Sequence, residues 1–146
     1  MILTTLFAAA LTVAAQAQGA PATDTPILGV AQASPDCGNL HGMAGRAFCV
    51  TAPIASIGAL ADEYSRHFEG QGWLAADGDD NRVILVKRRE GGGCDGLQMV
   101  AFYDTTRPAA PEAPGYLGFA TIPGDVCAAQ PAAQPAAAIP EPAPAQ

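Results

Sequence analysis

The sequence predicts a small α+β domain that is stapled by disulfides, in which one helix packs on an antiparallel sheet. Two observations in the middle of the chain support this fold. One amphipathic helical pattern is followed by three strand patterns, and four cysteines lie in the same stretch. A third observation, an apolar leader, places that domain outside the cytoplasm. We expect a short strand and the helix to precede a three-stranded antiparallel meander.

Residues 1–17 predict a secretory signal peptide. Residues 2–15 are apolar and uncharged, and they lead into Ala15-Gln16-Ala17, the small-x-small pattern that signal peptidase reads. The apolar stretch is shorter than the about 20 residues that a spanning helix needs. We therefore expect cleavage after Ala17, no membrane span in the mature form, and a periplasmic or secreted location. The Ala-rich leader and the Pro/Ala-rich tail are typical of bacterial proteins.

Composition divides the rest of the chain into three parts. Residues 18–36 contain three prolines and predict a flexible linker. Residues 37–127 hold all four cysteines and the periodic patterns, so they form the predicted α+β domain. Residues 128–146 consist almost wholly of Ala, Pro and Gln, and with so little to bury they predict a disordered tail that acts as a spacer.

The elements of the domain follow from periodicity. Residues 46–50 predict a short strand, after which Thr51 and Pro53 predict the start of a helix that Gly70 ends. Apolar side chains recur along one face of this helix, at Ile57, Leu60, Ala61, Tyr64 and Phe68. Residues 77–81 predict a turn, and residues 82–89, 97–103 and 116–122 predict three strands.

These strands carry apolar side chains on both faces, while one helix can cover one face only. We expect the second face to be covered by the linker, by the Pro-rich connection, by a second copy or by another protein. It would mediate self-association or partner binding through some of the following residues or their opposites: Val83, Leu85, Met99 and Phe119.

In a short exported chain, the cysteines predict two disulfides rather than a metal site or a redox pair, because no C-x2-C motif is present. Four cysteines allow three pairings. In a meander, the first long strand ends beside Cys94 and the third ends beside Cys127, at the same end of the sheet. We therefore expect the pairs Cys94–Cys127 and Cys37–Cys49. The alternative is that Cys37, His41 and Cys49 bind a metal.

The formal net charge of −7 argues against binding to nucleic acid, which needs a cationic surface. Lys87, Arg88 and Arg89 form a local exception and are candidate anion contacts at a basic strand end, residues 82–89.

Known catalytic and cofactor patterns do not fit this chain. Asp77-x-Asp79-x-Asn81 begins like a calcium loop, but Arg82 and Arg88 occupy positions that need Gly and Glu. Residues 91–93 are three glycines without the Lys-Ser/Thr of a phosphate loop. We expect no enzyme activity, no cofactor and no metal.

The sequence thus predicts a non-catalytic binding or accessory protein of the cell envelope, with an unidentified protein partner. The alternative is an enzyme inhibitor or small enzyme that uses the Pro-rich loop at residues 105–115 and the basic strand end.

Overall fold

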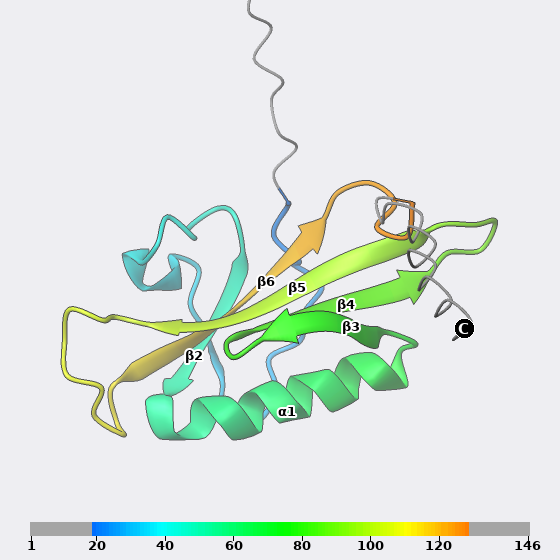
Figure 1. The fold of residues 1–146 in the computed structure, drawn as a ribbon. Coiled ribbons are helices and arrows are strands. Elements are labelled where there is room, and N and C mark those ends of the chain that lie inside the picture. The colour runs from blue at the N-terminus through cyan, green and yellow to red at the C-terminus, as the bar shows by residue number, and fades with distance from the viewer. Residues whose placement is uncertain (1–18, 129–146) are drawn as a thin grey trace, which may run out of the picture.

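The computed structural model describes residues 19–128 as one helix packed on one antiparallel sheet (Figure 1). The six strands lie in the order β1-β2-β6-β5-β4-β3. The α+β fold and the helix-on-meander packing are therefore confirmed, with more strands than predicted. The elements in chain order are β1 (Gln32–Ala33), the 3-10 turn η1 (Cys37–Asn39), β2 (Phe48–Pro53), α1 (Ile54–Gly70), β3 (Leu74–Asp79), β4 (Arg82–Arg88), β5 (Cys94–Tyr103) and β6 (Pro114–Ile122).

The predicted apolar face of α1 is the face that packs on the sheet. Leu60, Tyr64 and Phe68 are buried. The rings of Tyr64 and Phe68 lie 4.7 and 6.0 Å from the ring of Phe119 on β6. The start of the helix differs from the prediction, because Thr51 belongs to β2 and donates a hydrogen bond from Oγ1 to the Gly115 carbonyl at 2.9 Å.

The predicted interaction face turns out to be the face under the helix. Strand register aligns Val83, Met99 and Phe119 in one row across β4, β5 and β6. Leu85, Met99 and Phe119 are 1%, 2% and 0% exposed, so they form the core and are closed to a partner. Val83 is half-buried beside them. Only the opposite face, which the prediction also allowed, is open to association.

The second face is covered in part by the segment 34–47, which lies on the other side of the sheet from α1 (Figure 1). Its buried residues Cys37 and Ala47 pack with Cys49 of β2, and Met43 and Phe102 lie against this cluster. The disulfide Cys37–Cys49 joins the segment to the sheet.

The predicted linker belongs to the folded unit, which is a correction. Residues 19–22 run beside the end of β6, where the Thr121 N–H donates to the Ala20 carbonyl at 2.8 Å and the Ala22 N–H donates to the Phe119 carbonyl at 3.1 Å. Further along, Ala31 is buried in the core and β1 pairs with β2. The predicted leader and all but the first residue of the predicted tail lie outside the described residues.

The disulfide pairing is confirmed as predicted. Cys37 pairs with Cys49 across a Cα–Cα distance of 5.3 Å, and Cys94 pairs with Cys127 across 5.4 Å. Two disulfides are typical of a small domain in an oxidising compartment. Within residues 19–128, no helix has the length and apolar character needed to cross a membrane.

Candidate functional site

The Pro-rich loop between β5 and β6 is held in a defined shape at its first residue. Asp104 Oδ1 accepts hydrogen bonds from the Thr106 N–H at 2.9 Å and from Thr106 Oγ1 at 2.6 Å. Its other oxygen lies 3.3 Å from Arg107 Nε. The Thr106 hydroxyl, then its N–H, and more weakly the Arg107 guanidinium hold the pKa of the Asp104 carboxyl below its ordinary value. The carboxylate therefore fixes the turn that starts the loop.

The other end of the loop is fixed to the helix. No side chain caps the N-terminus of α1; instead, Ile54 N–H donates to the Ala113 carbonyl at 2.9 Å and Ala55 N–H donates to the Pro111 carbonyl at 3.1 Å. These bonds satisfy two of the backbone N–H groups that a helix start leaves unpaired. The intervening residues 105–112 are all exposed, so the loop is anchored at both ends and presented to solvent.

The segment 34–47 approaches the same end of the sheet. Cys37, Asn39 and His41 adopt φ angles of 53°, 55° and 52°, in the left-handed region that L residues with a Cβ rarely enter. The disulfide and the hydrogen bond from the Gly38 N–H to Asp36 Oδ1, at 3.0 Å, hold this conformation. A backbone of this kind persists only where its surroundings enforce it.

Aromatic side chains join this segment to β5 and β6. The rings of Phe102 and Tyr116 stack with centroids 5.3 Å apart, and the His41 ring meets Phe102 edge-on at 5.7 Å. The Gly38 backbone packs directly against the Tyr116 side chain, and a Cβ at Gly38 would come within 2.6 Å of the Tyr116 hydroxyl oxygen. The φ of Gly38, 66°, is also one that glycine favours.

A small cavity of about 140 Å³ lies where the loop, this segment and the helix start meet. It is lined by Gly38, Leu40, Ile54, Asp104, Arg107, Pro108, Ala113, Pro114 and Tyr116. Its wall combines apolar side chains with one acidic and one basic group, a composition suited to receiving a side chain of a partner protein.

On its other side, the loop adjoins an exposed stretch that is mostly apolar, with one carboxylate, that of Glu63, at the hollow it contains. Ala55, which is tied to Pro111, also lines a hollow of about 310 Å³ with Val30 and Ala59. Val30 is 63% exposed and nearby Ile27 is 47% exposed. The exposed positions of α1 carry no charge before Asp62. We call the loop residues 108–111 together with Val30, Ala55 and Ala59 the loop-end surface.

The predicted anion contacts do not converge. Lys87 Nζ lies 6.0 Å from the ring centroid of Trp73, while Arg88, as its neighbour on a strand, points to the opposite face of the sheet. Arg89 Nε is ion-paired to Asp95 at 2.6 Å and an Arg89 guanidinium nitrogen donates to the Gly124 carbonyl at 2.6 Å. Arg89 therefore ties the hairpin to the end of β6, and Arg88 stays a candidate contact.

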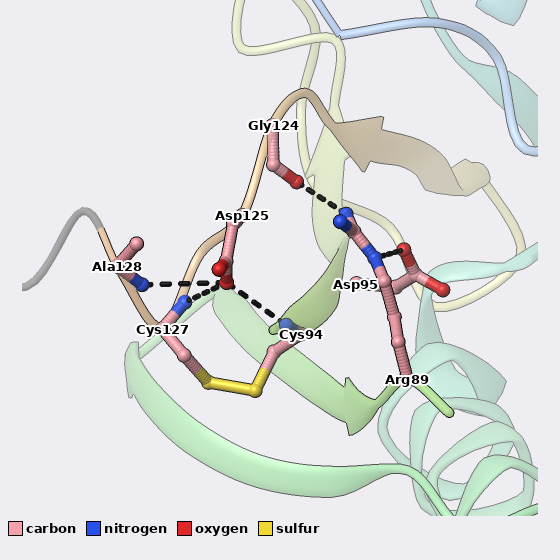
Figure 2. The surroundings of a disulfide bond; sticks show 7 residues. All are labelled: Arg89, Cys94, Asp95, Gly124, Asp125, Cys127 and Ala128. Carbon is pink, nitrogen blue, oxygen red and sulfur yellow. Dashed lines mark hydrogen bonds and ion pairs between the residues drawn. A yellow bond between two sulfur atoms is a disulfide. The ribbon is translucent and has the colours of Figure 1, made fainter. Parts of the chain in front are cut away.

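The corner around the second disulfide, shown in Figure 2, is organised by Asp125. Its Oδ1 accepts hydrogen bonds from the backbone N–H groups of Cys94, Cys127 and Ala128 at 2.8, 3.0 and 3.3 Å. The bond from Cys94 contributes most to holding the pKa of Asp125 below its ordinary value. Asp125 and both sulfurs lie within 4.8 Å of one another, but the disulfide leaves no thiolate to bind a metal.

The remaining candidates from the sequence also have structural roles. The acidic turn that resembled a calcium loop is the β3–β4 hairpin, in which Asp79 pairs with Arg82 at 3.2 Å. The cysteines considered as metal ligands with His41 are bonded to each other. Sequence reasoning missed Asp104 and Asp125, although each is an Asp just after a strand end, and Asp125 directly follows Gly124, which are typical turn signals.

Comparison with known proteins finds no protein family, no curated protein and no solved structure that matches this chain. The functional argument therefore depends on the residues and geometry described above.

Proposed function

We propose that this chain is an exported, non-catalytic protein of a bacterial cell envelope or its surroundings, and that it binds a partner protein through the loop-end surface. The predicted leader and the two disulfides support export. The observation that carries the proposal is that the loop is exposed along its length and fixed at both ends, by Asp104 and by the start of α1.

A loop held in this way loses little conformational entropy when a partner binds, so more of the contact energy appears as affinity. The loop-end surface itself is uncharged, and desolvation of charged groups opposes burial in an interface, so Arg107, Glu112 and Glu63 beside it would lie at the rim of the contact. The adjoining cavity and hollow, of about 140 and 310 Å³, would receive protruding side chains of the partner.

The absence of catalysis is part of the proposal and is supported by how the polar groups of residues 19–128 are used. Asp104 and Asp125 accept backbone hydrogen bonds that shape the chain, and the His67 ring pairs with Gln71 on the exposed side of α1. None of these groups adjoins a nucleophile in the arrangement that acyl or phosphoryl transfer needs.

Site-specific photo-crosslinking in the native host tests the docking surface. A benzoylphenylalanine placed at Ala109 in the loop should give discrete crosslinked species. The same group at Ala76, which is exposed on β3 at the far edge of the sheet, is the matched control. With the probe kept at Ala109, Ala110→Asp should abolish capture, because it puts a charge into the contact. Equal crosslinking from both positions would contradict the proposal.

An enzyme inhibitor is a second candidate, and the protrusion of the same anchored loop favours it. The partner identified by crosslinking distinguishes the two. If it is an enzyme, the purified chain should inhibit it, and Ala109→Asp should weaken that inhibition. If the partner has no enzymatic activity, or keeps it in the complex, the accessory role stands and inhibition is refuted.

A further inference from the structure

The second face of the sheet is open where the segment 34–47 does not reach. Strand register places Ile122, Gly96, Val86 and Leu74 in one row across β6, β5, β4 and β3. The next row contains Ala120, Gln98 and Ile84. Ile84, Val86, Val100 and Ile122 are half-buried, and Leu74 is 66% exposed. We call these five side chains the apolar strip.

Val126, near the last residue that the structure describes, extends the apolar strip. Gly96 has no side chain, and a Cβ there would lie 2.5 Å from Val126 Cγ1 and 2.9 Å from Ile122 Cβ. Val126 therefore fills the space above Gly96, so the row is continuous in apolar character from β6 to β4. Three strand spacings separate Ile122 from Leu74, which makes the strip roughly 14 Å long.

A cleft of about 240 Å³ adjoins the β6 end of the strip. It is lined by Gly19, Met43, Arg46, Ala47, Gln98, Ala120, Thr121, Ile122 and Pro123. Two groups give this cleft its polarity. The Arg46 side chain is exposed and makes no ion pair among residues 19–128. The Gln98 side chain is half-buried between apolar neighbours, and its amide forms no hydrogen bond within the described part of the chain.

The charges on this face favour a negatively charged ligand. Alternation along β4 puts Arg82 and Arg88 on the same side as Ile84 and Val86. Carboxylates on this side include two on the edge strand β3, where Asp79 is paired with Arg82 at 3.2 Å and Asp77 Oδ1 accepts the Gly78 N–H at 2.8 Å. Asp125, next to Val126, accepts three backbone N–H groups. Near the cleft the uncompensated charge is that of Arg46, although the whole chain carries −7.

We propose that the cleft and the apolar strip bind an anionic amphiphile with a carboxylate head and a linear alkyl chain. Arg46 and the Gln98 amide bind the carboxylate, since both offer N–H donors of the kind a carboxylate accepts. The alkyl chain lies over Ile122, Val86 and Leu74, whose combined length suits a medium-length fatty acid. This site is separate from the loop-end surface and does not depend on the function proposed there.

Calorimetric titration of the mature chain with sodium dodecanoate, below its micelle concentration, tests the site. Dodecanoate should bind, while dodecyltrimethylammonium, which has the same tail and the opposite charge, should bind at least tenfold more weakly. Hexanoate, whose chain cannot cover the strip, should also bind more weakly. No binding of dodecanoate, or equal binding of the cationic amphiphile, would overturn the proposal.

Two exposed substitutions locate the site. Arg46→Gln should lower dodecanoate affinity about tenfold, the effect expected from one charged hydrogen bond. Leu74→Ser should weaken dodecanoate binding and leave hexanoate binding unchanged. Arg66→Gln, an exposed charge on α1, is the matched control and should bind as the unmodified chain does. If Arg46→Gln and Arg66→Gln behave alike, the carboxylate does not bind in the cleft and the proposal fails.

Discussion

A single carboxylate at Asp125 accepts three backbone hydrogen bonds and so joins the end of β6 to the start of β5. These bonds hold its pKa below the ordinary value of 3.8, so the folded state favours the ionised form. The stabilisation is complete above the ordinary value and is lost as pH falls through the lowered one.

We therefore expect the midpoint of thermal unfolding to decrease in acid, in part because of Asp125. Asp125→Asn keeps an acceptor oxygen but does not titrate, so this part of the pH dependence should disappear. Thermal unfolding followed by circular dichroism between pH 2 and pH 7 measures the difference from the unmodified chain. Asp80→Asn, on the exposed β3–β4 turn, is the control. An unchanged pH profile in Asp125→Asn would contradict this role.

A second prediction at the scale of one residue concerns Tyr64. Its ring is fully buried, and its hydroxyl donates to the Pro26 carbonyl at 2.7 Å and accepts from the Leu28 N–H at 3.1 Å. Burial raises the pKa of this phenol above its ordinary value, so the hydroxyl keeps its proton, and its role as a donor, further into alkaline solution than an exposed tyrosine does. Tyr64→Phe leaves two backbone groups without partners and should lower the free energy of unfolding by about 1–3 kcal/mol. Urea denaturation measures this, and Tyr103→Phe, at an exposed tyrosine, should have little effect.

At the scale of elements, the sequence predicted what hydrophobic periodicity and chain order encode. The helix, the three long strands and both disulfides follow from local patterns and from the geometry of a meander. β3 could not be predicted, because Leu74–Asp79 contains Gly and Asp and no β-branched residue. It forms because β4 offers a hydrogen-bonding edge, which is a tertiary effect.

The candidate site was predictable only in part. The Pro-rich loop was recognised from its prolines. Its anchoring depends on hydrogen bonds from the first backbone N–H groups of α1 to loop carbonyls, and backbone contacts of this kind do not depend on side-chain identity, so they could not be predicted. The sequence also left open which sheet face the helix covers, because both faces are apolar at mid-strand. Which one the helix covers is decided by the whole topology.

The two disulfides should differ in their reaction with thiols. Cys37 and Cys49 are 0% and 1% exposed, whereas Cys127 is exposed at the end of the described chain. Thiolate attack requires access to a sulfur. Under mild dithiothreitol treatment of the folded chain, Cys94–Cys127 should be reduced first. Alkylation followed by peptide mapping identifies the reduced pair, and earlier labelling of Cys37 and Cys49 would show that the segment 34–47 opens readily.

At the scale of the whole molecule, the start of the mature chain is important both for export and for folding. The leader predicts that signal peptidase cuts between Ala17 and Gln18. The intact mass of the protein from its native host should therefore correspond to a chain starting at Gln18 with both disulfides formed. A soluble cytoplasmic species that retains residues 1–17 would refute the prediction. This cut leaves Ala20 and Ala22 in place to pair with β6.

The residues that follow the cut are needed for the fold, so a shorter chain should be unstable. A chain that begins at Ser34 loses the pairing of residues 19–22 with β6, the strand β1 and the buried side chains of Thr25 and Ala31. Each lost hydrogen bond contributes about 1 kcal/mol, and the total stability of a domain is only about 5–15 kcal/mol. We therefore expect the shorter chain to unfold at much lower urea concentration than the chain that begins at Gln18, or to fail to fold. If both chains unfold at the same urea concentration, residues 19–33 lie on the domain without stabilising it, and the sequence-based assignment of a linker would be right in thermodynamic terms.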